Sequence, residues 1–473
     1  MSQVMHKVVI FWSIGALLAL DECFFDGCRC VKNIDYSYDI ICVNQNNSLF
    51  PKRLKSNITR TINTFLLKQY LFTEIPDGTF QGLAIRHLII GENRLKKIGP
   101  DTFRGIKSLS LLKIIEKNFE TIDLGAFDPI SYYLSELGIW QINYQSHKID
   151  EFFAELKKLK SLKTLSLMGY GLKQFKPEWT TIFESIVHLN LASNEMKSIG
   201  PDIFKSCKHI ESINLNNNFM SNLSSIFRAL EPVKSKLREL KLASNQISQL
   251  KDFSAFARLE ALDLSNNQIK KIPTGLLKGL DKLNSLYLSS NLIRSLPDSL
   301  FSSVPALSIL MLDNNYLSTV PSVRTLSNLK ILDLSNQNGN LKELEDFLFE
   351  RANSTCCLYL NLDANRIEKY GKKTFCSRDS GLSEIRKLDL SYQSMANMDH
   401  CLLSQLRSDM ANKIEFYVTM ESEISKESTV SCNCELKSFL KSLKIGFIGP
   451  CSDVAGPCNE YQQTQQCDKQ FQC

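Results

Sequence analysis

The cysteines of this chain carry its clearest chemical signal, because most of them gather at its two ends. There are 15 cysteines among 473 residues. One group has the spacing Cys23-x4-Cys28-x-Cys30-x11-Cys42, and a second group comprises Cys432, Cys434, Cys451, Cys458, Cys467 and Cys473. In secreted proteins, disulfides staple small segments that lack a core of their own. We therefore expect a disulfide-bonded cap at each end of the chain.

The motifs of common catalytic sites are missing from the sequence. It contains no His-Glu-x-x-His, no Gly-x-Ser-x-Gly and no glycine loop of the phosphate-binding kind. We therefore expect no enzymatic activity, no cofactor and no bound metal.

A repeated pattern of apolar residues organises the chain between its ends. Counting Leu259 as offset 0 of one copy, apolar residues follow at offsets 3, 5, 10 and 13, with asparagine at offset 8. The same frame starts at Ile62, Ile85, Leu109, Leu134, Leu162, Ile186, Ile210, Leu237, Leu259, Leu283, Leu307, Leu329, Cys357 and Ile385. A period of about 24 residues indicates stacked repeats that bury their apolar faces against one another. The chain is therefore predicted to be a solenoid.

Each repeat should contribute one strand and one buried amide. Offsets 3 and 5 alternate with exposed positions, so stacked repeats should form a parallel sheet. An asparagine at offset 8 can satisfy backbone groups of adjacent turns. This position holds Asn93, Asn194, Asn218, Asn245, Asn267, Asn291, Asn315 and Asn365. On such a sheet His87 and His188 lie four strands apart, about 19 Å, which is too far for them to share a metal ion.

These repeats resemble the leucine-rich repeat family, specifically its extracellular type, as in Slit-like proteins and Toll-type ectodomains. The resemblance implies an α/β solenoid shaped as a horseshoe. It would have a parallel sheet of short strands on its concave side, irregular or helical segments on its convex side, and disulfide caps at both ends. In the N-terminal cap the resemblance implies the pairs Cys23–Cys30 and Cys28–Cys42. The C-terminal cap has six cysteines where four are usual, so its pairing stays open.

The remaining cysteines lie within the repeats. Cys207 falls at offset 21, where other repeats have an aliphatic residue, so we interpret it as a buried core thiol. The other four, which could staple the longer loops of the last repeats, are Cys356, Cys357, Cys376 and Cys401. Cys357 occupies a core offset and could instead remain a thiol. These interpretations together predict seven disulfides.

The termini and the surface indicate a secreted chain. Residues 1–20 combine a short basic start with an apolar run too short to span a bilayer, which is typical of a secretory signal peptide. A retained signal anchor is the alternative. Glycosylation sequons start at Asn46, Asn57, Asn222 and Asn353. No apolar run near the C-terminus could span a bilayer. We therefore expect an extracellular glycoprotein without a membrane span.

Offsets 2, 4 and 6 point away from the core, and their residue types vary along the chain. Repeats one to five present Leu66, Ile89, Leu111, Ile115, Trp140 and Met168, and repeats ten to thirteen present Tyr287, Ile309, Met311, Ile331 and Tyr359. Apolar patches on an open surface usually mark interaction sites. The alternative is a locally wrong frame, with Trp140 and Ile115 buried.

Five aspartates accompany the second of these patches, in repeats ten to thirteen: Asp263, Asp313, Asp333, Asp363 and Asp389. Aspartate at offset 4 (Asp263, Asp333, Asp389) is common in the family the chain resembles, so only Asp313 and Asp363, at offset 6, are unusual. The residues expected to contact a ligand are Leu111, Trp140, Tyr287, Ile309, Met311, Asp313, Ile331, Tyr359 and Asp363.

Two inserted segments have helical spacing. The first contains Ile149, Phe152, Phe153, Leu156 and Leu159, and the second Leu341, Leu344, Phe347 and Leu348. The first lies beside Lys157, Lys158, Lys160 and Lys163, which form either a solvated face or a weak glycosaminoglycan contact. The net charge of +6 does not by itself imply a nucleic-acid partner, and we expect none.

The sequence as a whole predicts a secreted scaffold that binds an extracellular or cell-surface protein through its concave face. The predicted order is a signal peptide (1–20), an N-terminal cap (21–61), about 14 repeats (62–431) and a C-terminal cap (432–473). The alternatives are a soluble ectodomain form of a receptor, a structural matrix component, and a non-catalytic subunit of an extracellular complex.

Overall fold

The chain folds into two compact units in a computed structural model. Unit 1 comprises residues 1–194 and 206–209, and unit 2 comprises residues 195–205 and 210–473. The structure describes residues 23–43, 48–54, 58, 60–140, 149–352, 358–376, 385–391, 402, 415–417 and 446–448. The expected signal peptide, the sequons at Asn46, Asn57 and Asn353, and the cysteines of the expected C-terminal cap lie outside these residues.

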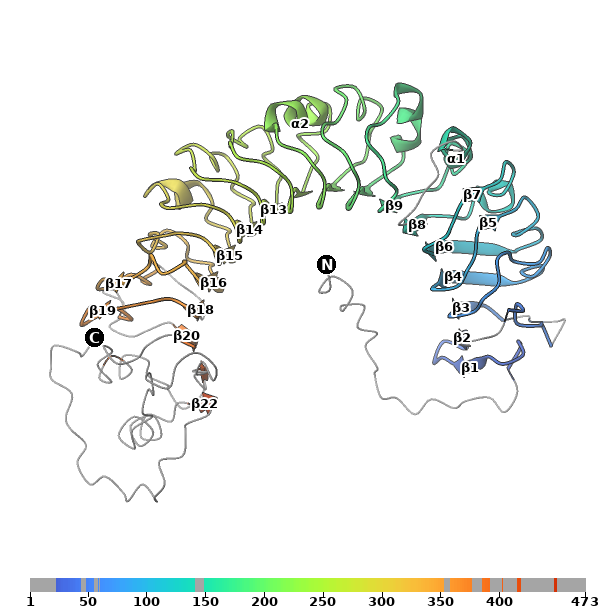
Figure 1. The fold of residues 1–473 in the computed structure, drawn as a ribbon, viewed down its shortest axis with the longest axis horizontal. Helices are drawn as coiled ribbons and strands as arrows, with labels where there is room; N and C mark the ends of the chain where they lie inside the picture. The colour runs from blue at the N-terminus through green and yellow to red at the C-terminus, as the bar shows by residue number, and fades with distance from the viewer. Residues whose placement is uncertain are drawn as a thin grey trace, which may run out of the picture. The chain divides into compact units, whose positions relative to one another are not determined.

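Unit 1 is a parallel-sheet solenoid that begins with an antiparallel hairpin (Figure 1). The hairpin consists of β1 (Arg29–Lys32) and β2 (Tyr38–Val43). From β2 onward each strand of the sheet pairs in parallel with the next: β3 (Ile62–Lys68), β4 (Ala84–Gly91), β6 (Ser108–Ile115), β8 (Glu136–Trp140), β9 (Thr164–Met168) and β10 (His188–Asn190). The elements between them are β5 (Lys97–Ile98), β7 (Thr121–Ile122), η1 (Asp128–Ile130), α1 (Ile149–Leu156) and η3 (Pro177–Phe183).

Unit 2 repeats the same architecture. Its sheet contains β11 (Ser212–Asn214), β12 (Glu239–Lys241), β13 (Ala261–Asp263), β14 (Ser285–Tyr287), β15 (Ile309–Met311), β16 (Ile331–Asp333), β18 (Leu358–Asn361), β20 (Ile385–Asp389), β21 (Glu415–Tyr417) and β22 (Gly446–Ile448), each parallel to the next. Away from the sheet lie α2 (Leu223–Leu230), η4 (Leu300–Ser303), and β17 (Glu343–Leu344) paired with β19 (Lys369–Tyr370). Figure 1 shows α2 on the side of unit 2 opposite its strands.

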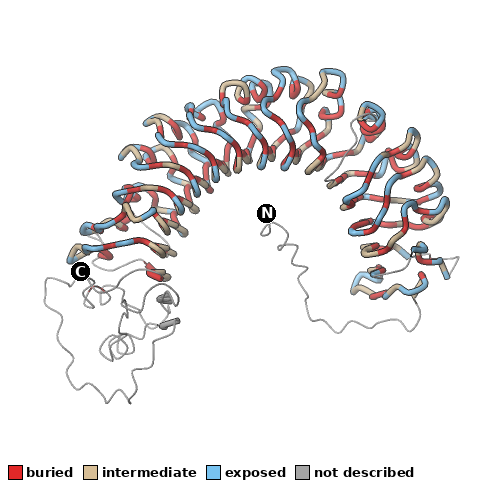
Figure 2. The backbone as a smooth tube through the Cα atoms, viewed as in Figure 1, coloured by how far each residue is buried: buried red, intermediate tan, exposed pale blue. Residues whose placement is uncertain are grey.

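The core of both units consists of the residues that the repeat frame places inside. Leu259, Leu262, Leu264 and Ile269 are fully buried. A second apolar layer at offset 18 is buried too, and its members are Phe80, Phe103, Phe127, Phe204, Phe301 and Phe375. Figure 2 shows buried segments recurring along each unit, once or more in every turn. Because each repeat supplies only one side of this core, neighbouring repeats stabilise one another.

Side-chain amides join the turns that follow the strands. The carbonyl oxygen of Asn194 accepts hydrogen bonds from the backbone amides of Tyr170 and Leu172, both at 3.0 Å. Its amide nitrogen donates to the backbone oxygens of Leu167 (2.8 Å) and Leu191 (2.9 Å). The same bonding to the preceding repeat recurs at Asn245, Asn267, Asn291, Asn315 and Asn365. Buried backbone groups that would otherwise lack partners are thereby satisfied.

Two turns of this ladder use a different side chain. Gln337 is fully buried and bonds as asparagine does, accepting from Leu317 N (3.0 Å) and donating to Leu312 O (2.9 Å). In the third repeat Glu116, only 1 % exposed, accepts from the backbone (3.1 Å) and side-chain (2.7 Å) amides of Asn93. An ionised carboxylate has no hydrogen to donate, so Glu116 can accept hydrogen bonds as an amide does but cannot donate them.

Of the two helices predicted from residue spacing, one is confirmed, and the prediction of the other is wrong. α1 forms where the spacing of Phe152, Phe153 and Leu156 predicted it, and these three side chains are buried. The segment from Leu341 to Leu348 instead contains β17 and a turn. Phe347 has φ of 60°, a left-handed conformation that a helix of L-residues does not accommodate. Leu341 and Leu344 are nevertheless fully buried, at offsets 12 and 15 of a repeat that is longer than most.

The helix that the sequence analysis missed is α2. Its N-cap is Asn222, whose side chain accepts a hydrogen bond from Ser224 N at 2.9 Å. Leu223, Ile226 and Leu230 lie on its buried face. An asparagine followed by apolar residues at helical spacing was the signal in the sequence for this helix.

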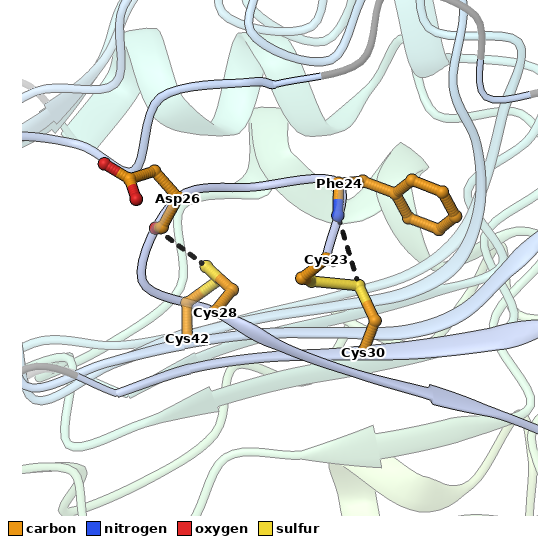
Figure 3. The surroundings of a disulfide bond; sticks show 6 residues. All are labelled: Cys23, Phe24, Asp26, Cys28, Cys30 and Cys42. Carbon is orange, nitrogen blue, oxygen red and sulfur yellow. Dashed lines mark hydrogen bonds between the residues drawn. A yellow bond between two sulfur atoms is a disulfide. The ribbon is translucent and has the colours of Figure 1, made fainter. Parts of the chain in front are cut away.

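The disulfides of the N-terminal hairpin are the expected ones. Cys23 is bonded to Cys30, and Cys28 to Cys42 (Figure 3). Phe24 N also donates to Cys30 Sγ at 3.4 Å. Cys207 is a buried thiol outside these disulfides, as expected. Cys376 is disulfide-bonded, and Cys356, Cys357 and Cys401 lie outside the described residues.

The first prediction concerns Glu116. Burial raises its pKa to about 7 from 4.5, against the hydrogen bonds from Asn93, and Glu92 raises the pKa further. Its Oε2 is buried without a hydrogen-bond partner. Because the pKa is raised on folding, the stabilisation is complete below about pH 4.5 and is lost as the pH rises through about 7. Glu116→Gln should therefore stabilise unit 1 by about 1–2 kcal/mol at pH 8.

Urea unfolding followed by tryptophan fluorescence at about pH 5 and pH 8 measures this effect, because both described tryptophans, Trp140 and Trp179, lie in unit 1. The control is Glu184→Gln, an exposed carboxylate of the same unit. If the free energy of unfolding changed with pH as steeply in Glu116→Gln as in Glu184→Gln, Glu116 would not titrate as proposed.

Candidate recognition surfaces

The strand register of unit 2 aligns the outward side chains into rows on the open face of the sheet. Along offset 2 the row runs Ser285, Ile309, Ile331, Tyr359, Lys387, and along offset 4 it runs Tyr287, Met311, Asp333, Asn361, Asp389. Asp313 and Asp363 lie at offset 6, two residues after Met311 and Asn361 in the sequence. The structure therefore brings together all seven residues that the sequence analysis selected in this part of the chain.

The apolar members of these rows form one surface, which we call the unit 2 strip: Tyr287, Ile309, Met311, Ile331 and Tyr359. Ile331 lies opposite both Ile309 and Tyr359, and Tyr287 lies opposite Met311. Paired strands are about 4.8 Å apart, so these side chains are in lateral contact. All five are half-buried, as expected for residues that pack on their neighbours but face outward.

Aspartates at offset 4 have a structural role. The carboxylates of Asp263, Asp333 and Asp389 each accept a hydrogen bond from the backbone amide two residues on, at 3.0, 2.9 and 3.0 Å. Asn361 does the same for Asp363 N at 3.0 Å. Such bonds hold the turn that ends each strand. The interpretation of these aspartates as general features of the repeat therefore has a physical reason.

Asp313 and Asp363, at offset 6, do not cap their own strands. Asp313 accepts hydrogen bonds from Ser289 Oγ and, at 2.6 Å, from Asn314 Nδ2. Asp363 Oδ1 is buried and has no hydrogen-bond partner. Burial raises the pKa of Asp363 to about 6, and repulsion from Asp389 and Asp333 adds to the shift. Burial likewise raises the pKa of Asp333, with a contribution from Asp313.

Unit 1 has a separate apolar surface on its own sheet face. Ile115, Trp140 and Met168 lie opposite one another on β6, β8 and β9, and Leu66 lies opposite Ile89. Trp140 and Ile115 are half-buried, so the repeat frame is correct here and the alternative, that these two residues are buried, is wrong.

Trp140 is held against its own sheet. Its Nε1 donates to Ser166 Oγ at 3.3 Å. A Cβ at Gly138 would lie 4.0 Å from that nitrogen and 3.3 Å from Lys113 Cγ. A side chain at this position would therefore press on the stem of Lys113, whereas its contact with the indole would be an ordinary one.

One member of the unit 1 surface was not predicted from the sequence. Ile41, on β2 of the disulfide-bonded hairpin, lies opposite Leu66 and is half-buried. The repeat frame starts only at Ile62, so it does not reach this strand. An isoleucine between two buried positions, Ile40 and Cys42, was the signal available.

The two histidines of the sheet and the lysine cluster lie at separate places in unit 1. His87 and His188 lie in one row but four strands apart. In the described ranges, no three His, Cys, Asp or Glu residues are placed to hold a metal ion. Lys158 bonds to Asp128 and to the buried Glu155, both at 2.7 Å, so it supports the fold. Of the lysines considered for glycosaminoglycan contact, Lys157, Lys160 and Lys163 are exposed.

Stacked parallel strands, buried leucines and an amide ladder define a leucine-rich repeat solenoid. The family model described as leucine rich repeat matches residues 235–293 and 281–339. A second, described as a BspA type leucine rich repeat region, matches residues 73–176 and 140–248. The chain belongs to the leucine-rich repeat family, and its relatives place it with the extracellular type.

Curated relatives match part of the chain. Human Toll-like receptor 3 is 30% identical over 207 residues, covering 41% of this chain and 22% of that protein. Human podocan-like protein 1 is 33% identical over 233 residues, 47% of this chain and 43% of that protein. Tsukushi-A of Xenopus laevis is 28% identical over 203 residues, 42% of this chain and 49% of that protein. The matches thus span less than half the length of each of these relatives.

A solved structure shares the fold. A leucine-rich repeat protein of Leptospira interrogans superposes with a TM-score of 0.51 at 18% identity, over 82% of this chain and 90% of that one. At this identity the likeness concerns the fold alone.

The second prediction tests which side chains face outward. Leu310 is fully buried and its neighbour Met311 is half-buried on the open face of β15. Leu310→Ala should destabilise unit 2 by about 2–5 kcal/mol because it leaves a cavity. Met311→Ala should cost about 0.5 kcal/mol. Urea unfolding followed by far-UV circular dichroism measures both. Equal losses for the two variants would contradict the assigned register.

Proposed function

We propose that this chain is a non-enzymatic recognition scaffold that binds another protein through the open sheet face of unit 2. The observation that carries the proposal is the unit 2 strip, in which aromatic, methionine and isoleucine side chains adjoin on a surface where the fold needs none of them. Contiguous apolar surface of this kind favours protein contact. Aromatic and methionine side chains are enriched where such contacts are strongest.

The extent of the sheet suits a protein partner. The eight strands from β11 to β20 are separated by seven steps of about 4.8 Å, or about 34 Å in all. A standard interface takes about 800 Å² from each partner. A patch of this length and three rows of side chains wide is of that order. The aspartates beside the strip would repel a phosphate backbone, which disfavours nucleic acid on this face.

We also propose that the protein is extracellular and glycosylated. Two disulfides stapling one hairpin are typical of oxidising compartments. None of the described helices is long and apolar enough to cross a membrane. Asn222 is exposed, and its side chain accepts from Ser224 N through Oδ1. Its Nδ2 is the atom that carries a glycan, so a glycan is compatible with this cap.

The third prediction separates the cap from the sequon at Asn222. Ser224→Ala removes the sequon but keeps the backbone amide that Asn222 caps. The secreted variant should lose the mass of one glycan and should unfold at the temperature of the deglycosylated native protein. Ser225→Ala, outside the sequon, is the control. Mass spectrometry before and after glycosidase treatment reads the result, and identical glycan masses for both variants would refute modification at Asn222.

The fourth prediction tests the recognition surface. The partner is identified by crosslinking to the tagged native protein in extracellular fluid, then purified for affinity measurements. Met311→Ala combined with Tyr359→Ala should weaken its binding by about tenfold or more, since truncating central anchors costs about 1–2 kcal/mol each. Secretion should be unchanged because both side chains lie outside the core.

The matched control for this test is Phe219→Ala combined with Tyr316→Ala. These side chains also belong to unit 2, and Phe219 is 46% exposed, but both lie beyond the strands. The control should keep its affinity within about twofold. Equal affinities for the two double variants would remove the unit 2 strip from the binding site.

A further inference from the structure

We propose that the partner segment bound by unit 2 is cationic: a lysine- or arginine-rich protein segment that lies over the unit 2 strip and along the acidic line beside it. The acidic line comprises Asp313, Asp333, Asp363 and Asp389. This inference rests on the proposed function and adds the chemistry of the partner to it.

The sign of the charge on this face is opposite to that of the chain. Across the outward positions from β13 to β20 there are five aspartates, the acidic line and Asp263, and one lysine, Lys387. Their formal charge is therefore −5 + 1 = −4, whereas the whole chain carries +6. The remaining residues must then carry +10. An acidic face on a basic protein favours a basic partner at that face and disfavours an acidic one.

The carboxylates of the acidic line are close enough to repel one another. Asp313 raises the pKa of Asp333, and Asp333 and Asp389 raise that of Asp363, in each case after the larger effect of burial. They come from four successive repeats, whose strands pair in register. A cation held over them would lower this repulsion, which gives binding energy that a neutral ligand does not obtain.

Contacts among the described residues neutralise little of this charge. Asp333 accepts from Ser335 N and Oγ and from Asn361 Nδ2, all neutral donors. Ser289 and Asn314, the donors to Asp313, are neutral as well. Neutral donors stabilise a carboxylate without removing its charge. In the described part of unit 2, no ion pair to a carboxylate of the acidic line is found.

The apolar part of the face is also suited to cations. Lys387 Nζ lies 4.9 Å from the centre of the Tyr359 ring, so this ring already accepts a cation from the chain itself. Tyr287, two strands before Ile331, presents a second ring on the same face. Arginine and lysine bind over such rings and extend their aliphatic stems across apolar side chains. A basic segment could therefore use both the unit 2 strip and the acidic line.

The test uses the full chain and two fluorescent synthetic peptides, one of repeated Lys-Leu-Lys-Tyr and one of repeated Glu-Leu-Glu-Tyr, with binding followed by anisotropy. The native protein should bind the basic peptide at least about tenfold more tightly than the acidic one, and added salt should weaken this binding. Asp313→Asn combined with Asp363→Asn should reduce the affinity about fivefold or more. Affinity should also rise from about pH 5 to pH 7.5 as Asp363 ionises beside Asp389 and Asp333.

The control is Asp281→Asn combined with Asp298→Asn, which changes the net charge equally at two exposed positions outside the strands of unit 2. It should bind the basic peptide within about twofold of the native protein. Equal losses in both double variants would mean that only net charge matters, and the proposal would fail. It would also fail if the acidic peptide bound equally well or if spermine alone competed as strongly as the peptide. A dimer seen by light scattering and lost in the Asp313 and Asp363 double variant would likewise contradict it, because a second copy would then occupy this face.

The two experiments distinguish failure of this inference from failure of the proposed function. Loss of partner binding in the Met311 and Tyr359 double variant, without a preference for the basic peptide, would keep the recognition surface and reject only the cationic partner. The opposite result is a peptide preference that depends on Asp313 and Asp363, with native partner binding intact in the Met311 and Tyr359 double variant. That result would keep the cation-binding face and reject the unit 2 strip as the site of the native partner.

Discussion

Backbone satisfaction at the end of each strand is the constraint on which the rest of this structure depends. Strands of three residues, such as β13 and β14, are too short to fix a sheet by themselves. The turn after each strand buries backbone groups that no helix or sheet would satisfy. In most repeats one amide bonds both to its own turn and to the preceding one, as Asn267 does with Leu264 O and Leu242 O. Successive repeats are thereby locked in one register.

That register determines which residues lie side by side on the surface of the sheet. Once Leu286, Leu310 and Leu332 are aligned in the core, the residues beside them must also be aligned on the open face. A residue's surface neighbours therefore lie about one repeat away in sequence rather than beside it in the chain. Few inward positions are free to vary, whereas the outward positions carry no packing requirement. Their chemistry is thus the part of each repeat that recognition can alter at low cost to stability.

The same logic explains what the sequence could predict. Core positions, the row membership of the outward residues and the two N-terminal disulfides were accessible because they depend on a periodic pattern and on the resemblance to a known family. The failures occur where local signals compete with that pattern. The leucines at 341 and 344 have helical spacing, but they are buried in the core of a repeat that contains a short strand there instead of a helix. Ile41 was missed because the hairpin precedes the first repeat, and Glu116 because a carboxylate is an unexpected substitute for an amide.

The proposed role of Asp313 and Asp363 contrasts with the position of Glu116, which has the same chemical group. Glu116 is buried within the ladder, so its charge opposes folding and its environment favours the neutral acid. Asp313 and Asp363 are half-buried at the rim of the open face, where water partly solvates them and the fold does not require their charge. A buried carboxylate without a cation costs stability whatever binds outside. A rim carboxylate keeps most of its charge until a partner arrives, and it can therefore select that partner by sign.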